Sequence, residues 1–497
     1  MPRHSPIDLS PDEFRRLGHR LVDDLAEFLT TLPSGPVAPG ETPVDVRRLL
    51  PARPLPLDGA DAGTLLAEAT RLLADHSVFN GHPRFMGYIT SSPAPLGSLA
   101  ELLAAVMNPN CGSWGLSPVA TLIEQQTVAW IAELLGAPAT TGGLLVSGGN
   151  MANMLGFWAG RAARASWDLR KHGVAQAGAP ALCVYCSAET HTWIQKAADL
   201  SGLGTDAVRW VAVDAERRMD VGALERHIRD DLAAGRLPFL VVGTAGSVSM
   251  GAVDPLHEIA ALCREHRLWF HVDGAYGAPA VAAREAPPEL RAMADADSIA
   301  VDPHKWLYAP LEAGCALVRD PAHLRAAFSY TPVYYHFESG DAAPPPNYYE
   351  YGPQNSRGFR ALKVWMTLQQ VGRRGYEAMI GEDIRLSRRL FELCQAHAEI
   401  EAVTQSLSIT TFRYVPQGPP LPVDALNALN EQLLDRLIAS GRAYVSNAVL
   451  DGRFLLRSCI VNFRTTEADL VELVRAVVEI GHALHAHDGT TARHEGS

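Results

Sequence analysis

The chain has 497 residues, of which 47% are hydrophobic and 20% are charged, and this composition excludes a wholly disordered, collagen-like or coiled-coil protein. Its 43 Lys and Arg residues against 55 Asp and Glu residues give a formal net charge of −12, which argues against nucleic acid as a partner. No apolar run approaches the roughly 20 residues that a bilayer span requires, so we expect no membrane segment.

The first predicted element is a helix that begins after Ser10. Ser10 can cap this helix, Pro11 suits its first turn, and Glu13 completes a capping box. Apolar residues then recur at helical spacing over residues 14–28 and form one stripe. Residues 33–56 are rich in Pro and Gly and predict an extended connection. The stripe therefore needs another surface, either the body of the same chain or a partner subunit.

Short β-rich runs alternate with helical segments between residues 140 and 320. Their spacing of about 20 to 30 residues suits βαβ crossovers and a mainly parallel sheet. Ligands of such sheets bind at the carboxyl ends of the strands. The predicted strands are 143–147, 182–186, 208–213, 239–243, 269–273, 298–301 and 315–318.

The C-terminal part begins with a long predicted helix at residues 357–371. Strands at 409–414 and 454–462 flank a helix at 422–440, which predicts a smaller α+β domain. The predicted organisation is an N-terminal helical segment (1–92), a large α/β domain (93–372), a small α+β domain (373–485) and a disordered tail (486–497).

The seven cysteines suit a reducing cytoplasm better than a disulfide framework, because their number is odd and they are spread along the chain. The first residues also lack the apolar segment of a signal peptide, so we expect a cytoplasmic protein. Cys183 and Cys186 form a CxxC inside a predicted strand without a second pair, which favours core packing over zinc or redox chemistry. We predict no metal site.

A glycine-rich turn follows the first predicted strand, in the sequence LLVSGGN at residues 144–150. Its glycines allow backbone N–H groups to approach an anion, and the helix predicted at 151–163 adds a favourable dipole. The spacing matches neither a Walker A motif nor GxGxxG. Taken alone, the segment leaves phosphate binding and a plain strand-to-helix turn equally open.

A carboxylate and a lysine follow two other predicted strands. Asp273 ends the run 269–273, and a buried Asp needs a partner, which a ligand, an Arg or a helix N-terminus can supply. Lys305 stands in the sequence DPHKW at 302–306, beside His and Trp. A partly desolvated lysine can act as an amine nucleophile, although a lysine extending from a loop is the plainer interpretation of this piece alone.

Together these pieces predict a pyridoxal 5′-phosphate site. That cofactor needs an amine for its aldehyde, a carboxylate for its pyridine nitrogen and a cradle for its phosphate. Lys305, Asp273 and residues 147–150 supply these three groups. His191 follows the strand 182–186 and can stack on the ring. Thr244 follows the strand 239–243 and can hydrogen-bond the polar edge of the cofactor.

Two motifs, HVDGAY at 271–276 and DPHKW at 302–306, show that the sequence resembles the group II pyridoxal-phosphate decarboxylases. This family includes the aromatic-L-amino-acid, histidine and glutamate decarboxylases. The resemblance runs from the first helix to about residue 480. Further matching segments are residues 82–85, 117–118 and 355–363.

The resemblance implies a fold type I enzyme with a mainly parallel seven-stranded sheet, flanking helices and a small C-terminal α+β domain. It implies that Lys305 binds the cofactor covalently and that Asp273 holds the pyridinium. His191 would stack on one face of the ring, opposite Ala275. The phosphate site would be lined by Gly148, Gly149, Asn150, Asp302 and His304.

The resemblance also implies a homodimer whose N-terminal helices pack on the partner subunit and whose pockets take residues from both chains. Tyr88, Ser356 and residues 110–112 are then candidates for substrate contacts. Residues 110–112 (Asn-Cys-Gly) depart from the bulkier apolar residues of the aromatic branch. Tyr334, in a long irregular segment typical of a lid, would return a proton to the substrate carbon.

The expected activity is decarboxylation of an L-amino acid to the amine and CO2, and we favour an aromatic amino acid. Two alternative activities remain open. One is that of an aldehyde synthase, which decarboxylates and oxidatively deaminates its substrate, and the other is decarboxylation of an acidic or basic aliphatic amino acid. Relatives with synthase activity tend to carry Phe at the position of Tyr334, and no extra Arg stands among the aligned pocket positions. A binding protein without activity is disfavoured, because Lys305, Asp273 and His191 are all present.

Overall fold

A seven-stranded sheet forms the centre of the large domain in the computed structural model, which describes residues 5–330 and 345–494. Its order is β1-β7-β6-β5-β4-β2-β3, and β7 runs antiparallel to both of its neighbours while the other pairs are parallel. The prediction of a mainly parallel sheet is therefore confirmed. The strands are β1 (Gly142–Val146), β2 (Leu182–Ser187), β3 (Val208–Val211), β4 (Leu237–Thr244), β5 (Trp269–Asp273), β6 (Ser298–Val301) and β7 (Gly314–Val318).

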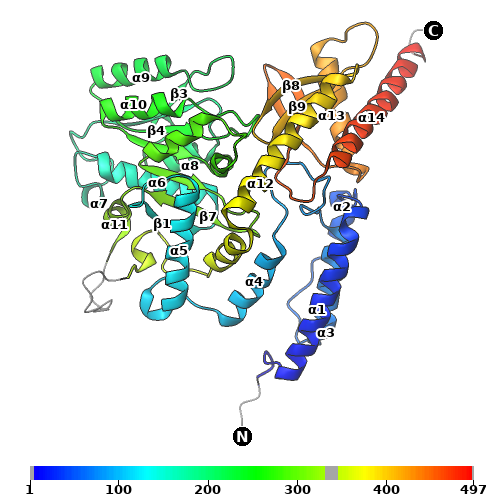
Figure 1. Cartoon of the computed structure of the whole chain (residues 1–497), viewed down its shortest axis with the longest axis horizontal. Helices are drawn as coiled ribbons and strands as arrows, with labels where there is room; N and C mark the ends of the chain where they lie inside the picture. Colours follow the sequence, from blue (N-terminus) through cyan, green and yellow to red (C-terminus); the bar gives the residue numbers. More distant parts are fainter. Residues whose placement is uncertain (1–4, 331–344, 495–497) are drawn as a thin grey trace.

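Helices cover both faces of this sheet (Figure 1). Because successive side chains of a strand point to opposite faces, Phe270 and Trp269 of β5 belong to two different hydrophobic clusters. Burial on both faces explains why these strands read as continuous apolar runs. The helices of this domain are α5 (Pro118–Leu134), α6 (Gly149–Arg164), α7 (Leu169–His172), α8 (Trp193–Leu200), α9 (Val221–Ala233), α10 (Leu256–His266) and α11 (Ala322–Phe328).

A four-stranded antiparallel sheet of order β10-β11-β9-β8 forms the small domain, with two helices packed together beside it. The predicted strands 409–414 and 454–462 correspond to β9 and β11, and the predicted helix 422–440 corresponds to α13. Helix α14 extends to His494 and so covers residues 486–494 of the predicted tail. The elements are β8 (Ile400–Ser406), β9 (Ile409–Tyr414), β10 (Ser446–Leu450), β11 (Arg453–Cys459), α13 (Val423–Ala439) and α14 (Glu467–His494).

A long helix, α12 (Ala361–Ala396), connects the two domains (Figure 1). Its first part corresponds to the helix predicted at 357–371. The predicted end is wrong, because the chain kinks at Gly372 (φ +65°) and then continues as a helix. Burial of Tyr376, Ile380 and Ile384 holds this second half in place.

The N-terminal helices are α1 (Pro11–Thr31), α2 (Pro43–Leu49), α3 (Ala62–His76) and α4 (Pro95–Met107). The Ser10 side chain caps α1 by accepting the N–H of Glu13, as predicted. The connection 33–56 is not wholly extended as predicted, because Thr42 and Asp45 form a capping box that starts α2. Helices α1 and α3 lie side by side and project from the rest of the molecule (Figure 1). Among the described residues, we find no helix with the length and apolar character to cross a membrane.

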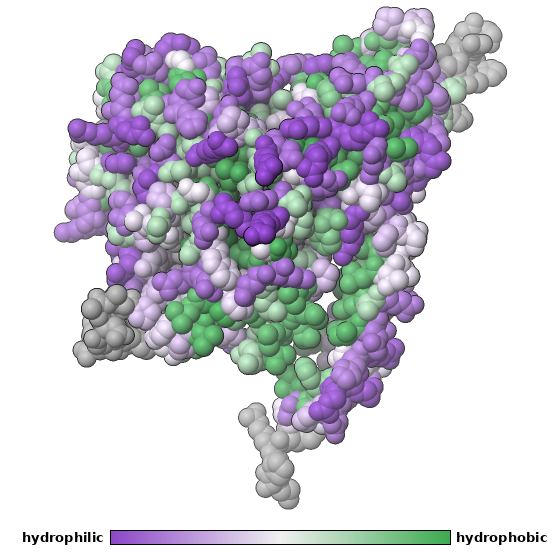
Figure 2. All heavy atoms as spheres, viewed as in Figure 1, coloured by the Kyte–Doolittle hydropathy of each residue, from purple (hydrophilic) through white to green (hydrophobic). Residues whose placement is uncertain are grey.

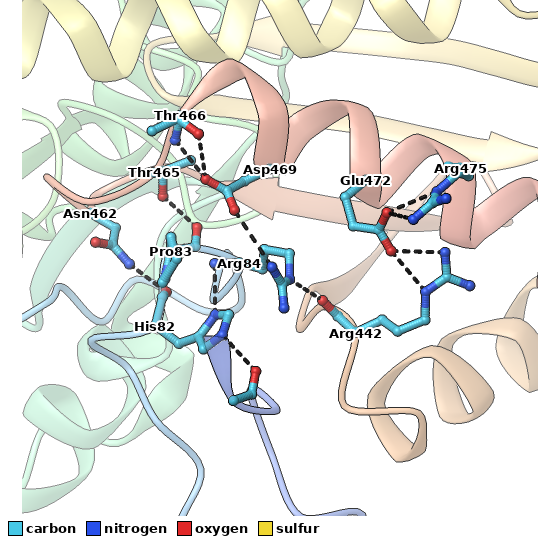
Figure 3. A network of polar contacts seen from close by, with 11 residues as sticks. His82, Pro83, Arg84, Arg442, Asn462, Thr465, Thr466, Asp469, Glu472 and Arg475 are labelled. Carbon is cyan, nitrogen blue, oxygen red and sulfur yellow. Dashed lines mark hydrogen bonds and ion pairs between the residues drawn. The ribbon is translucent and has the colours of Figure 1, made fainter. Parts of the chain in front are cut away.

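The segment after α3 is fastened to the small domain by a buried polar network (Figure 3). Asn462 donates to the backbone oxygen of His82 at 2.7 Å, and Thr465 donates to that of Pro83 at 2.7 Å. Arg84 donates to the backbone oxygen of Arg442 at 2.6 Å. Burial lowers the pKa of His82, which keeps this ring neutral inside the junction. The matching motif at 82–85 is therefore a structural joint between distant parts of the chain.

Candidate active site

A cavity of about 480 Å³ opens where β1, β2, β4, β5 and β6 end. These strands share one direction, so the residues after their carboxyl ends meet at one edge of the sheet. All ten residues predicted to bind the cofactor line the cavity. They are Gly148, Gly149, Asn150, His191, Thr244, Asp273, Ala275, Asp302, His304 and Lys305.

The turn between β1 and α6 depends on its two glycines. Gly148 is the N-cap of α6 and has φ +148° and ψ 180°, a conformation almost confined to glycine. A Cβ on Gly149 would lie 2.6 Å from Oδ2 of Asp302 and 3.1 Å from Cβ of Ala275. The turn therefore leaves a bare backbone cradle at a helix N-terminus, where N–H groups and the dipole favour an anion.

Lys305 reaches the floor of the cavity from the segment after β6. Its Nζ lies 3.1 Å from Oδ2 of Asp302, whose side chain is almost fully buried. The Nε2 atom of His304 lies 3.7 Å from the same oxygen, and burial lowers the pKa of His304. Asp302 is thus the counter-ion that holds the lysine amine at this edge of the sheet.

Asp273 is the last residue of β5 and is paired in register with Thr244, the last residue of β4. Its Oδ2 accepts the indole N–H of Trp193 at 2.7 Å, and its Oδ1 accepts the N–H of Ala275 at 3.3 Å. In the described part of the chain, we find no Lys, Arg or His that forms an ion pair with this carboxylate. A buried carboxylate without a cationic partner fits a cationic ligand group in the cavity.

His191 faces the cavity from the loop between β2 and α8. Partial desolvation lowers its pKa, so the ring is neutral near pH 7. Its Nδ1 accepts the backbone N–H of Trp193 at 3.3 Å, which places the ring proton on Nε2. A neutral, oriented imidazole is suited to stack on an aromatic ring.

Three residues behind the cavity were not identified by the sequence analysis as site residues. Trp193 binds Asp273, and Asp254 accepts the backbone N–H of Thr244 at 2.8 Å. His271 is fully buried, and burial lowers its pKa to about 4. His271 is the first residue of the HVDGAY motif and Trp193 stands two residues after His191, so their positions were a usable signal, whereas nothing in the sequence marks Asp254.

The single chain does not bring every candidate into the cavity. Tyr88 is exposed and packs against Tyr444, and Ser356 is exposed beside residues 110–112, where Asn110 accepts the N–H of Arg357. Neither Tyr88 nor Ser356 lines the cavity. Tyr334 lies outside the described residues.

Comparison with known proteins identifies the family. The pyridoxal-dependent decarboxylase conserved domain matches residues 43–415. The chain belongs to this decarboxylase family. The decarboxylase is 31% identical to an aromatic-L-amino-acid decarboxylase of Bacillus atrophaeus, over 95% of this chain and 96% of the relative. It is 34% identical to an L-2,4-diaminobutyrate decarboxylase of Rhizobium meliloti, over 87% and 85% of the two chains.

A similar solved structure is that of Oryza sativa TDC with PLP and tryptamine. The TM-score is 0.89 at 26% identity, with 97% of this chain and 100% of the other covered. The decarboxylase is accordingly a carboxy-lyase of fold type I, and its cofactor is pyridoxal 5′-phosphate.

The cavity fits this cofactor at three points. The glycine turn presents bare backbone at a helix N-terminus, where a Cβ on Gly149 has no room beside Asp302 and Ala275. Asp273 lacks a cationic partner among the described residues, and Lys305 lines the same cavity. These groups match the phosphate, the ring nitrogen and the aldehyde respectively. Both motifs that carried the sequence resemblance therefore lie in one site.

Proposed function

We propose that this decarboxylase converts an aromatic L-amino acid to the corresponding amine and CO2. The observation that carries the proposal is the cavity in which the glycine turn, Asp273 and Lys305 converge. The aromatic-L-amino-acid decarboxylase relative and the tryptamine complex of the similar structure support the substrate class.

The polar groups of the cavity favour an aromatic side chain over a charged one. Two further carboxylates line it, but Glu189 lies 3.5 Å from Arg217 and Glu312 lies 2.9 Å from Arg360. Each carboxylate already has an arginine beside it, and this positive charge lowers the attraction of the site for a basic side chain. No arginine is among the described residues that line the cavity, which argues against an acidic side chain.

The positions of the residues that line the cavity support the following roles. The chemistry supplied by bound pyridoxal phosphate is that of an electron sink for the pair left on the substrate carbon when CO2 leaves. Asp273 stabilises the positive charge on the ring nitrogen and so maintains that sink. His191 would orient the bound ring by stacking, Thr244 would contact its polar edge, and the Lys305 amine would hold the aldehyde and take the place of the product amine. Tyr334 donates a proton to the substrate carbon, and this role rests on the resemblance alone.

A panel of CO2-release assays tests the substrate class. We expect kcat/KM for at least one of tyrosine, tryptophan, phenylalanine, L-DOPA and 5-hydroxytryptophan to exceed that for 2,4-diaminobutyrate, glutamate and histidine by roughly 100-fold, the discrimination that side-chain contacts typically provide. The molar amount of amine formed should equal that of CO2 released, and little aldehyde, ammonia or hydrogen peroxide should form. Preference for 2,4-diaminobutyrate would establish the second candidate, which the Rhizobium meliloti relative favours. Aldehyde as the main product would establish a synthase.

We also propose a homodimer, because large apolar surfaces stay uncovered in the single chain. Helix α1 leaves Phe14 and Leu25 about half exposed, and α4 leaves Leu102, Leu103 and Met107 exposed. Figure 2 shows hydrophobic side chains gathered over α4 and on the inner side of the α1–α3 pair. Exposed apolar patches of this kind mark protein interfaces. A partner covering them would also lie next to Ser356 and residues 110–112, which pack beside each other.

Leu103→Asp should convert the wild-type dimer to a monomer, because it places a charge in the proposed interface. Light scattering after size-exclusion chromatography measures the mass, and most of the turnover should be lost with the dimer. Leu232→Asp on α9 is the matched control, since Leu232 is 48% and Leu103 46% exposed in the single chain. The control should remain an active dimer. A wild type that is monomeric and fully active would contradict the proposal.

A further inference from the structure

Trp193 contacts both side chains that we assign to the cofactor ring. Its indole N–H donates to Oδ2 of Asp273 at 2.7 Å, and its backbone N–H donates to Nδ1 of His191 at 3.3 Å. His191 is assigned to the face of the ring and Asp273 to the ring nitrogen. Trp193 therefore contacts both the residue assigned to the face of the cofactor ring and the residue assigned to the ring nitrogen.

The indole has little freedom to move. Trp193 is the first residue of α8 and is fully buried. Phe157 packs edge-on against it with ring centroids 6.5 Å apart, and His271 does the same at 5.5 Å. Because His271 precedes Asp273 by two residues on β5, the His271 imidazole and the Asp273 carboxylate lie on the same face of this strand. The N–H direction is thus set by packing, not by the hydrogen bond alone.

The carboxylate depends on this donor for its orientation. Among the residues that the structure describes, the other donor to Asp273 is the N–H of Ala275, at the longer distance of 3.3 Å to Oδ1. A hydrogen bond to an ionised group is shorter and stronger than one between neutral groups, and the 2.7 Å contact is of that kind. Without the hydrogen bond from Trp193, the Asp273 carboxylate can rotate about its Cβ–Cγ bond and turn away from the position that the ring nitrogen of the cofactor would occupy.

We propose that Trp193 is a positioning residue of this decarboxylase: its indole N–H holds the Asp273 carboxylate in the orientation that meets the ring nitrogen of the cofactor. The proposal rests on the role proposed for Asp273 and is independent of the amino acid that the enzyme decarboxylates. Trp193 does not line the cavity, and it acts through Asp273.

Trp193→Phe tests the proposal, because it retains an aromatic ring and the backbone N–H to His191 and removes the indole donor. Equilibrium dialysis with pyridoxal phosphate should show affinity weakened by about 10-fold or more, the value of one hydrogen bond to a charged group. At saturating cofactor, kcat should fall by a similar factor while KM changes less than about twofold, since the lost interaction acts on the transition state. Trp269→Phe is the matched control. Trp269 is also a buried indole with one side-chain acceptor, Oγ of Ser298 at 2.8 Å, and it does not contact Asp273.

A double-mutant cycle with Asp273→Asn separates positioning from packing. Asp273→Asn can still accept the indole N–H but carries no charge for the ring nitrogen to meet. If the indole acts by orienting that charge, Trp193→Phe should weaken cofactor binding much less in the Asp273→Asn background than in the wild type. Equal weakening in both backgrounds would overturn the proposal and assign Trp193 to packing. The proposal would also be overturned if Trp193→Phe and Trp269→Phe lowered the melting temperature equally while Trp193→Phe bound the cofactor as tightly as the wild type. If Asp273→Asn alone leaves cofactor binding and turnover unchanged, the role of Asp273 fails first, and the proposal about Trp193 fails with it.

Discussion

Lys305→Ala should abolish covalent attachment of pyridoxal phosphate and reduce turnover by a factor of roughly 10²–10⁴ or more, the range typical for loss of a group that moves protons in the reaction. After borohydride treatment and proteolysis, mass spectrometry should find the cofactor on the peptide that contains Lys305 in the wild type and on no peptide of the variant. The variant should still bind the cofactor reversibly, because the glycine turn and Asp273 remain.

The chain makes this experiment unusually clean. Its lysines are Lys171, Lys196, Lys305 and Lys363. Of these, Lys305 lines the cavity, whereas Lys363 pairs with Glu101. Lys171→Ala on α7 removes an exposed amine and serves as the control, with attachment and turnover unchanged. Attachment to Lys196 or Lys363 in the wild type would show that the assignment of Lys305 is wrong.

The large domain was predictable because its strands carry a strong local signal. The bounds of β5 and β6 agree with the predicted 269–273 and 298–301. Both strands are buried on both faces, so each is a mainly apolar segment in the sequence. Asp273 ends the first segment and Asp302 follows the second.

Elements whose stability comes from other parts of the chain were harder to predict. Strand β8 is partly exposed along most of its length and shows no apolar alternation, and β10 is short and exposes two of its five residues. Both are held by pairing with β9 and β11, and pairing is not visible in a single segment. The helix beyond Gly372 was missed for a related reason, since a glycine marks a local break but does not show whether tertiary contacts continue the helix.

The candidate site divides in the same way. Lys305, Asp273 and the glycine turn each follow a strand, so the topology brings them together without knowledge of side-chain packing. The donor to Asp273 could not be found this way. Trp193 and Asp273 are 80 residues apart, and only the packing of the indole against Phe157 and His271 makes it point at the carboxylate. Tyr88 and Ser356 belong to a third class, because their proposed role requires a second chain.

Asp273→Asn should reduce kcat by roughly 10²–10³-fold or more while the protein still folds and binds its cofactor, by analogy with removing one electrostatic contact to developing charge. Asn has nearly the shape of Asp, and its amide oxygen can still accept the indole N–H of Trp193. The change therefore removes the negative charge and little else. Without that charge the ring nitrogen is no longer held protonated, and the ring accepts electrons poorly when CO2 leaves. Stopped assays of CO2 release at saturating cofactor and substrate measure the loss.

Comparing Asp273→Glu with Asp273→Asn tests whether turnover depends on the position of the carboxylate as well as on its charge. Asp273→Glu keeps the charge but adds a methylene group, which moves the carboxylate away from the ring nitrogen and away from Trp193, so it should be impaired as well. Asp231→Asn controls for the loss of a buried carboxylate in the same domain, because Asp231 pairs with Arg209 and Arg236 outside the cavity. That control should lower the melting temperature and leave kcat of the folded enzyme near the wild-type value. If Asp273→Asn instead turned over at the wild-type rate, another group would have to hold the ring proton, and a carboxylate at the end of β5 without an ion-pair partner among the described residues would need a different explanation.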